Sequence, residues 1–232
     1  MKVSICIPTW EQYGRGVEFL KKNFEEISLQ TYKNYNVVIS DHSKDNNIKL
    51  LCDEYSNKFE IKYVKNEKLF GNSPANTNNA IKNSDGEIIK ILFQDDFFYD
   101  KNGLELIVNR FKNLECNWLV SGCNHTKDDG KTFINFMIPY WNPQIVLGIN
   151  TISSPSVLSF RKKSPCLFDE NLIMLMDGEM YYQLYKQYGL PEIINDTLIT
   201  NRMHQHQISS LYKKNINEEI DYVKIKHNIY KS

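Results

Sequence analysis

The chain has 232 residues, of which 41% are hydrophobic and 24% are charged, and these values exclude a disordered, collagen-like or coiled-coil protein. Lys and Arg together number 28, as do Asp and Glu, so the formal net charge is zero and no overall field draws the chain to nucleic acid. The length suits one α/β domain, or two fused halves around one cleft.

Short apolar runs alternate with helical periodicity over the first 96 residues. The apolar runs predict buried strands over 2–8, 35–40, 60–64 and 87–93. The periodicity predicts helices over 15–29, 48–56 and 73–83, the last with Ser73 as its N-cap and Pro74 at its first position. Elements that alternate in this way form βαβ units and a parallel sheet, and such sheets bind ligands at the carboxyl ends of their strands.

The second half of the chain is less regular. Its patterns predict helices over 104–111 and 177–188, a strand over 118–121, and a hairpin partner over 132–137. Residues 198–206 are expected to return toward the strand ends, and the tail, 211–232, mixes Lys with Glu as an exposed helix does.

The five cysteines are odd in number and irregularly spaced, which indicates reduced thiols rather than a disulfide framework. The short apolar run before Pro8 does not resemble a signal peptide, and no run reaches the roughly 20 apolar residues of a membrane helix. These features favour a cytoplasmic protein.

Asp95 and Asp96 follow an apolar strand at the point where a ligand is expected. Adjacent carboxylates repel each other, and a divalent cation such as Mn²⁺ or Mg²⁺ relieves that repulsion while binding phosphate oxygens. A neutral imidazole is a suitable third ligand, and His204 is the candidate. The alternative is a solvated turn in which one carboxylate caps a helix.

Two further aspartates each have two interpretations. Asp41 ends the second predicted strand, where its carboxylate either accepts a hydrogen bond from a nucleobase or ribose or closes an Asx turn. Asp177 begins a helix after an apolar stretch, so it acts either as a general base with a raised pKa or as a carboxylate that balances the helix dipole.

Small hydroxylated side chains and an aromatic ring suggest where a sugar could lie. Ser154 and Ser156 suit a polyhydroxylated ligand, although they suit a strand edge equally well. Trp141 could stack on a sugar face, as aromatic surfaces do, whereas core packing is the stronger expectation for Trp118.

Six segments together resemble the family 2 glycosyltransferases, which are inverting enzymes of GT-A fold. They are SICIPTWEQ, SLQTYKNYNVVISDHSKDN, GNSPANTNNAIKNSDGEIIKILFQDD, SSPSVLSFRKK, FDENLIMLMDGEMYYQL and RMHQHQIS, in the family's order and at its spacing over about residues 3–210. The chain departs from the family pattern at His42, Ala75, Phe93 and Met176, where the family usually has Asp, Arg, Asp and Glu.

The resemblance implies a GT-A domain over 1–232, with a central, mostly parallel Rossmann-like sheet flanked by helices. Residues 1–96 would form a nucleotide-sugar-binding half, 97–210 a smaller acceptor-binding half, and 211–232 a C-terminal tail. The implied nucleotide-binding residues are Pro8, Thr9, Glu11, Asp41, Asn76 and Asp95. The implied ligands of Mn²⁺ or Mg²⁺ are Asp95, Asp96 and His204.

The function implied is transfer of a sugar, with inversion, from a nucleoside-diphosphate donor to an acceptor hydroxyl. A UDP-sugar is the favoured donor, Asp177 would be the base, and Ser154, Ser156 and Trp141 would line the acceptor or sugar pocket. The acceptor would be a glycan or a lipid-linked glycan in polysaccharide or glycoconjugate synthesis, and a lipid-linked acceptor would bring a peripheral membrane contact.

The sequence also bears on three other functions. A dehydrogenase needs G-x-G-x-x-G after its first strand, and a nucleotidyltransferase needs a Gly-rich basic loop there, but the chain has Trp10 and Glu11 at this place. A catalytically impaired GT-A relative that binds a nucleotide or sugar is the serious alternative, because Phe93 and Met176 depart from the family pattern.

Overall fold

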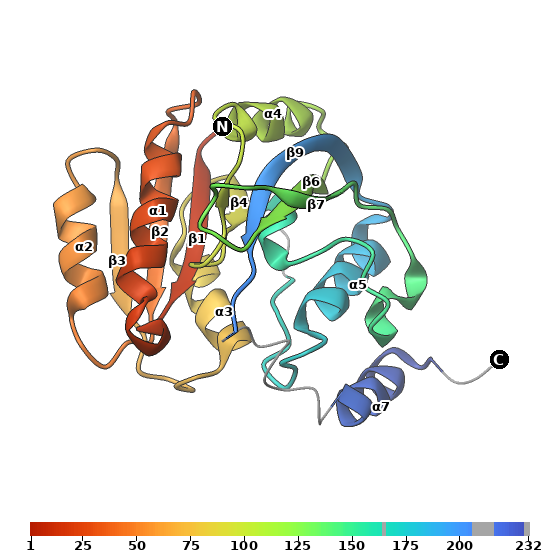
Figure 1. Cartoon of the computed structure of the whole chain (residues 1–232). Coiled ribbons are helices and arrows are strands. Elements are labelled where there is room, and N and C mark those ends of the chain that lie inside the picture. Colours follow the sequence, from red (N-terminus) through yellow and green to blue (C-terminus); the bar gives the residue numbers. More distant parts are fainter. Residues whose placement is uncertain (164–165, 206–215, 230–232) are drawn as a thin grey trace.

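A computed structural model describes residues 1–163, 166–205 and 216–229 (Figure 1). In these ranges, nine strands form one sheet in the order β3-β2-β1-β4-β8-β6-β9-β5, with β7 paired to β6. The strands are β1 Val3–Thr9, β2 Tyr35–Asp41, β3 Ile61–Lys65, β4 Ile88–Ile91, β5 Phe97–Phe98, β6 Trp118–Thr126, β7 Ile134–Met137, β8 Leu158–Arg161 and β9 Glu192–Arg202. The α-helices are α1 Gly16–Ser28, α2 Asn47–Tyr55, α3 Ser73–Asn83, α4 Gly103–Phe111, α5 Met176–Tyr188 and α7 Ile216–His227.

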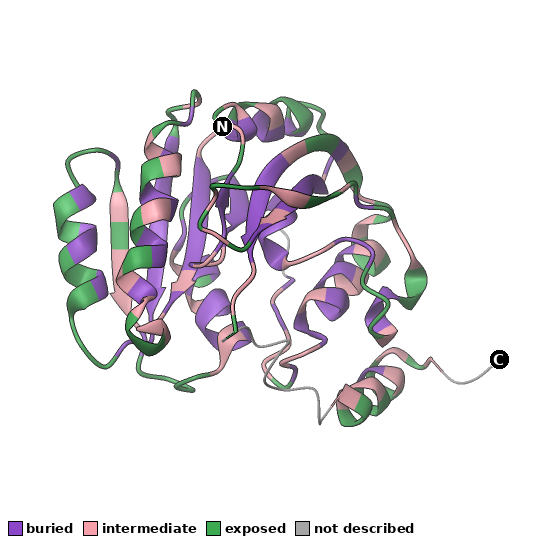
Figure 2. Ribbon diagram, in the orientation of Figure 1, coloured by how far each residue is buried: buried purple, intermediate pink, exposed green. Residues whose placement is uncertain are grey.

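The first half of the sheet is parallel, as the sequence predicts. β1 pairs in parallel with β2 and with β4, and β2 pairs in parallel with β3. Right-handed crossovers put α1 and α2 on one face and α3 on the other, because the chain reverses its direction across the sheet after β3 (Figure 1). Every residue of β2 and β4 is buried, as expected for strands covered on both faces (Figure 2).

The second half of the sheet is mixed. β8 is antiparallel to both β4 and β6, β6 and β9 are parallel, and β5 is antiparallel to β9. β7 forms the predicted hairpin partner of β6. The predicted α/β class, a mostly parallel sheet flanked by helices, is thus confirmed, and every antiparallel pair in the described ranges includes β5, β7 or β8.

Two local predictions are wrong. β6 extends to Thr126 instead of ending at Ser121, because irregularities in its pairing with β9 let the polar residues after Val120 stay in the strand. Helix α3 is capped by Asn72 and not by Ser73, since the Asn72 side chain accepts a hydrogen bond from Ala75 N at 2.8 Å.

The core includes the cysteine thiols and Trp118. None of the five cysteines, all of which are described, forms a disulfide bond, and all are buried. Each helix in the described ranges is too short or too polar to cross a bilayer. The Trp118 side chain is 1% exposed, its ring stacks on Tyr181 with centroids 6.4 Å apart, and its Nε1 donates to Gly189 O at 3.0 Å.

Trp118→Ala is expected to lower the free energy of unfolding by about 3–5 kcal/mol, because a large buried ring is replaced by a cavity. Urea unfolding at neutral pH measures this change. Leu114→Ala is the control, since Leu114 is 80% exposed and its truncation should change stability by less than about 0.5 kcal/mol. Equal effects of the two variants would contradict this assignment of the core.

Candidate active site

Asp41 lies fully buried at the carboxyl end of β2, where protein groups surround its carboxylate. Its Oδ1 accepts from Thr9 Oγ1 at 3.2 Å and from Ser43 N at 2.9 Å, and the second contact closes the Asx turn weighed above. Its Oδ2 accepts from Tyr63 OH at 2.7 Å and lies 3.6 Å from Lys65 Nζ. The local structure is therefore an Asx turn, and contact with a nucleotide stays a prediction.

Asn76 ties the start of α3 to the ends of two strands. Its Oδ1 accepts from Ser40 Oγ at 2.7 Å and from Asn66 Nδ2 at 3.2 Å. Its Nδ2 donates to Thr9 O at 3.1 Å. The amide is nearly all buried and connects α3 with β1 and β2, and its predicted contact with a nucleotide stays a prediction.

The turn after β1 connects Asp41 with the segment that holds Asp95, two of the predicted nucleotide-binding carboxylates. Thr9, whose hydroxyl donates to Asp41, is followed by Trp10, whose N–H donates to Gln94 Oε1 at 3.0 Å. Gln94 directly precedes Asp95. The ends of β1, β2 and β4 are thus joined by hydrogen bonds along one edge of the sheet, which is where parallel sheets bind ligands.

Pro8 and Glu11 lie beside this turn, and both are partly buried. The Glu11 carboxylate accepts a hydrogen bond from Lys44 N at 3.2 Å, which connects the turn after β1 with the loop after β2. Their predicted roles in binding a nucleotide stay predictions.

Asp95 and His204 meet although 109 residues separate them in sequence. Asp95 Oδ2 lies 3.0 Å from His204 Nε2, and the two side chains are 19% and 8% exposed. The His204 ring also packs on Phe19, with ring centroids 5.2 Å apart. The pairing of a carboxylate from the end of β4 with an imidazole from the end of β9 is the arrangement that the resemblance implies.

Asp96 points into the protein. Its Oδ2 accepts from Ser156 Oγ at 2.5 Å and from Ser154 Oγ at 3.2 Å, and its Oδ1 accepts from Arg202 N at 3.2 Å. Burial, and then the neighbouring charge of Asp95, raise the pKa of Asp96 to about 7. Ser154 and Ser156, predicted to line a sugar pocket, therefore bind this carboxylate.

The side chains present suit a divalent cation only in part. In the described ranges no three His, Cys, Asp or Glu side chains form a metal-binding cluster, because Asp96 turns inward from Asp95 and His204. Asp95 and His204 nevertheless supply a carboxylate oxygen and an imidazole nitrogen, which Mn²⁺ accepts together with phosphate oxygens. This donor set fits a cation that shares its coordination with a bound diphosphate.

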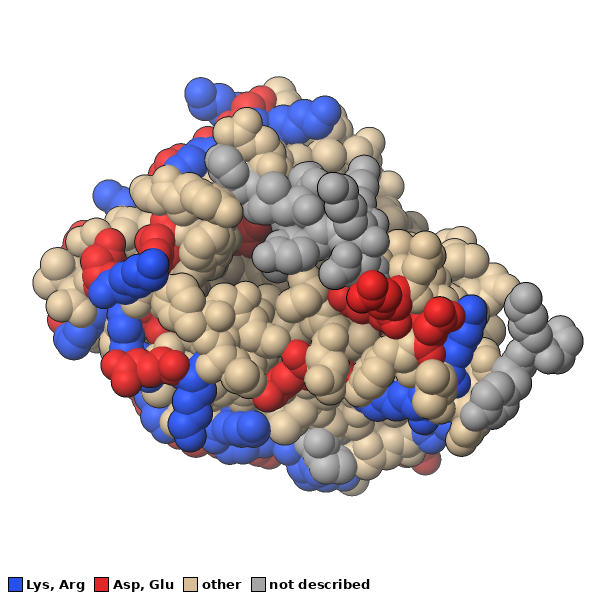
Figure 3. All heavy atoms as spheres, turned by 90° about the horizontal axis from the view of Figure 1, so that it is seen from below, with Lys and Arg blue, Asp and Glu red and all other residues tan. Residues whose placement is uncertain are grey.

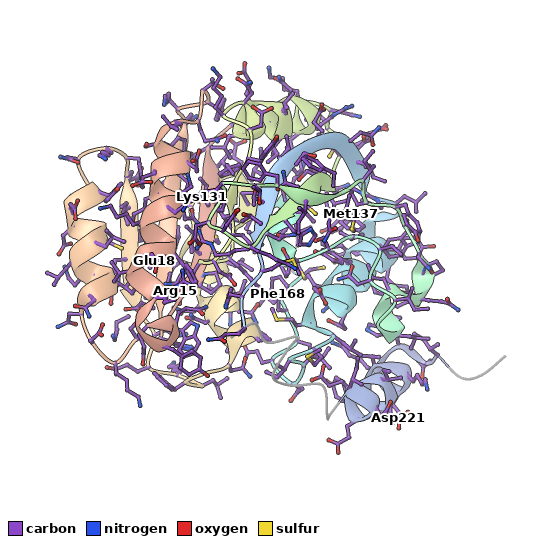
Figure 4. The ribbon with its side chains drawn as sticks, viewed as in Figure 1. Arg15, Glu18, Lys131, Met137, Phe168 and Asp221 are labelled. Carbon is purple, nitrogen blue, oxygen red and sulfur yellow. The ribbon has the colours of Figure 1, made fainter. Side chains whose placement is uncertain are left out.

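A cavity of about 270 Å³ opens beside His204, with Arg15, Lys127 and Arg202 among its lining residues. Arg15 pairs with Glu18 at 2.7 Å, and Figure 4 shows these two side chains near the lower end of α1. Asp129 also lines the cavity and pairs with Arg202 at 3.0 Å and with Arg15 at 3.6 Å, so the lining carries charges of both signs.

Asp177 lies in the first turn of α5 and is partly buried. Its Oδ2 accepts from Asn150 Nδ2 at 2.7 Å, and its Oδ1 accepts from Gly178 N at 2.7 Å. Burial raises the pKa of Asp177 to about 6, against the lowering effect of these hydrogen bonds. A carboxylate with this pKa is ionised at neutral pH and remains basic enough to accept a proton.

One chain segment connects Asp177 to Asp96. Asn150, which donates to Asp177, also donates to Ser153 O at 3.1 Å. The next residue, Ser154, donates its hydroxyl to Asp96. The predicted base and the carboxylates at the strand ends are therefore tied together through 150–154, as a common site requires.

Trp141 packs within an aromatic cluster. Its ring stacks on Tyr185 with centroids 4.4 Å apart and meets the buried Trp118 edge-on at 6.1 Å. It is partly buried, so its predicted contact with a sugar stays a prediction.

Sequence reasoning missed three residues that support this site. Lys90 is fully buried on β4 and donates its Nζ to Ser156 O, and burial lowers the pKa of this amine to about 7. Its place inside the apolar run EIIKILF is a signal that could have found it. Asn150 and Glu219 gave no such signal, although Glu219 of α7 accepts hydrogen bonds from the backbone N–H groups of 173–175, just before α5.

Figure 3 shows the charges on one face of the molecule. In Figure 3, acidic and basic side chains both occur along the margins of the visible face, and uncharged residues fill much of its middle. This pattern gives no sign of a nucleic-acid-binding surface on the visible face.

Two curated relatives carry the name uncharacterized glycosyltransferase. The one from Rickettsia typhi is 26% identical over 223 residues, and the one from Rickettsia prowazekii is 24% identical over 234 residues. The alignments cover 90% and 94% of this chain and 66% and 69% of the relatives, so the chain spans about two thirds of their length.

Solved structures share the fold. TarS of S. aureus in complex with UDP-GlcNAc matches with a TM-score of 0.77 and 17% identity, over 97% of this chain and 66% of that one. The mannosyltransferase PcManGT from Pyrobaculum calidifontis, in complex with GDP-Man and Mn²⁺, matches with a TM-score of 0.63 and 12% identity, over 99% and 65%. Both are glycosyltransferases of GT-A fold, which confirms that fold for this chain.

The sequence profile described as glycosyl transferase family 2 matches residues 4–166, which is more than half of the chain. The matched part includes the ends of β1, β2 and β4, where Asp41 and Asp95 lie. The chain therefore belongs to glycosyl transferase family 2.

Proposed function

We propose that the chain transfers a sugar, with inversion at the anomeric carbon, from a UDP-sugar to the hydroxyl of a glycan or lipid-linked glycan. The observation that carries the proposal is Asp177, a partly buried carboxylate with a pKa raised to about 6, tied through 150–154 to Asp96, the neighbour of Asp95. The proposed division of labour assigns the donor to residues 1–96 and the acceptor to 97–210, in a cytoplasmic enzyme of polysaccharide or glycoconjugate synthesis.

In the proposed mechanism the nucleotide lies along the carboxyl ends of β1, β2 and β4. Asp95 and His204 would hold Mn²⁺ or Mg²⁺, which when bound stabilises negative charge on the leaving diphosphate. Asp177 takes the proton from the acceptor hydroxyl while the hydroxyl oxygen attacks the anomeric carbon. The attack comes from the face opposite the diphosphate, and this direction inverts the configuration.

A UDP-sugar is proposed as the donor because the structural neighbour TarS binds UDP-GlcNAc and UDP, and GDP-Man, which PcManGT binds, is the alternative. The first test is therefore thermal unfolding with UDP, GDP or dTDP, each with and without Mn²⁺. A ligand that binds the folded chain raises its apparent stability. We expect UDP with Mn²⁺ to give the largest rise, and no rise with any of the three nucleotides would overturn the assignment.

Sugar release from UDP-GlcNAc then distinguishes an enzyme from a binding module. An active enzyme transfers GlcNAc to a glycan acceptor or, more slowly, to water, and it releases UDP. A chain that binds UDP in the presence of Mn²⁺ and releases no UDP from a panel of UDP-sugars would be the catalytically impaired relative, whose acidic pattern is broken at Phe93 and Met176.

Turnover is expected to rise with pH through a limb centred near pH 6. The burial of Asp177 raises its pKa to about 6, so the carboxylate is mostly protonated at pH 5 and mostly ionised at pH 7. Only the ionised form accepts a proton, so kcat should fall about tenfold from pH 7 to pH 5. A pH profile of UDP release measures this limb, and a profile flat from pH 5 to pH 7 would contradict the role of Asp177.

A further inference from the structure

Both the oxygen and the nitrogen of the Asn150 side-chain amide form hydrogen bonds near the N-terminus of α5. Its Oδ1 accepts from Ile152 N at 2.9 Å and from Ser153 N at 3.0 Å. Its Nδ2 donates to Ser153 O at 3.1 Å and to Asp177 Oδ2 at 2.7 Å. An amide offers two donor hydrogens and two acceptor lone pairs, so all of them are used.

The two backbone N–H groups fix the orientation of this amide. Because Oδ1 must face the donors of Ile152 and Ser153, Nδ2 is directed at Asp177 and donates to its carboxylate. A donor favours the ionised form of a carboxyl group. In the described ranges the other donors to this carboxylate are backbone N–H groups, those of Gly178, at 2.7 Å from Oδ1, and of Asp177 itself, so Asn150 is its side-chain donor.

The turn made by Asn150 holds a strained residue. Ser153 has a φ of 104°, a backbone conformation that residues other than glycine rarely adopt. Its carbonyl accepts from Asn150 and from Tyr181 OH, at 3.1 Å each, and its hydroxyl accepts from Asn201 Nδ2 at 2.9 Å. Such strain persists only where the surrounding contacts enforce it, and here they set the distance between Asp177 and the segment that binds Asp96.

We propose that Asn150 is a positioning residue, which aims the Asp177 carboxylate and keeps it ionised for proton transfer. This inference rests on the proposed function, in which Asp177 is the base. The charged and titratable groups that face Asp177 are Tyr181 on its own helix and Glu219 on α7, and the charge of Glu219 opposes ionisation. Asn150 supplies the side-chain donor that counters it.

Asn150→Asp separates this role from a structural one. The new carboxylate can still accept from Ile152 N and Ser153 N, so the turn is kept. The group that faces Asp177 changes from a donor to a negatively charged acceptor, which disfavours ionisation of Asp177. Asn113→Asp is the matched control, because exposed Asn113 closes a similar turn by accepting from Glu115 N at 3.1 Å, outside the segments of the site.

The direct measurement is the pKa of Asp177 from ¹³C NMR of protein labelled at the aspartate carboxyl carbons, with the resonance assigned by its loss in Asp177→Asn. We expect about 6 in the wild type and in Asn113→Asp, and a rise of about one unit or more in Asn150→Asp. Asn150→Ser, whose shorter hydroxyl can accept in the turn but which lacks the Nδ2 group that reaches Asp177, should give a smaller rise. An unchanged pKa in both Asn150 variants would overturn the proposal.

UDP release from UDP-GlcNAc gives the kinetic arm of the same test. At pH 6.5 Asn150→Asp should turn over several-fold more slowly than the wild type, and the two rates should converge by about pH 8.5 as Asp177 ionises in both. A loss by the same factor at every pH would mean a structural role and would overturn the proposal. If Asp177→Asn keeps full activity, the proposed function fails instead. The pKa of Asp177 measured by NMR still tests whether Asn150 favours the ionised form of its carboxyl group.

Discussion

Asp177→Asn is expected to lower kcat for sugar transfer by about 10²–10⁴-fold, the usual contribution of a general base. The dissociation constant of UDP should stay unchanged, because Asp177 lies on α5, outside the strand ends assigned to the nucleotide. Radiolabelled sugar transfer and isothermal titration with UDP measure the two quantities on the same preparation.

This variant should fold at least as well as the wild type. Burial raises the pKa of Asp177 to about 6, so the folded chain holds an extra proton between about pH 4 and pH 6, and this group's contribution to stability falls as pH rises through that range. A neutral Asn removes that effect at pH 7.5. Asp221→Asn is the matched control, since Asp221 lies on the outer side of α7 (Figure 4) and makes one weak pair with Lys224 at 3.6 Å. Equal kcat in both variants would exclude Asp177 as the base.

Asp95→Asn is expected to weaken Mn²⁺-dependent binding of UDP by at least about 10²-fold, because it removes the carboxylate that would share the cation with the diphosphate. Binding of UDP without a metal should change little, since the charge of Asp95 acts on the nucleotide through the cation. Titration of UDP with and without Mn²⁺ separates the two effects.

Two comparisons sharpen this result. His204→Ala removes the partner 3.0 Å from Asp95 and should show the same metal-dependent loss. Asp53→Asn is the control, because Asp53 is an exposed residue of α2 that pairs with Lys49. If Asp95→Asn binds UDP and Mn²⁺ as tightly as the wild type, the cation is held elsewhere or is not required.

The first half of the fold follows from local patterns. β1, β2 and β4 are short apolar runs, and the helices between them have one apolar face, so the sequence alone predicts their order and their parallel pairing. The second half depends on pairing between distant segments. β6 reads as a short strand followed by polar residues because its irregular contact with β9 cannot be seen in sequence.

The site was predictable in its residue types and less so in its geometry. The carboxylates at the strand ends and the meeting of Asp95 with His204 follow from motifs at those ends. The inward turn of Asp96 does not, because it depends on Ser154 and Ser156, some 60 residues later. Asn150 has no motif at all, since its partner Asp177 lies in another element and only the folded chain joins them.

The central claim is that a nucleoside diphosphate and a divalent cation bind at the strand ends beside Asp95 and His204. Anomalous diffraction at the manganese edge, from crystals of the chain grown with UDP and Mn²⁺, tests it most directly. We predict a manganese peak bonded to the Asp95 carboxylate or the His204 imidazole, with UDP phosphate oxygens completing its coordination. A peak remote from both residues, or UDP bound away from the ends of β1, β2 and β4, would contradict the claim.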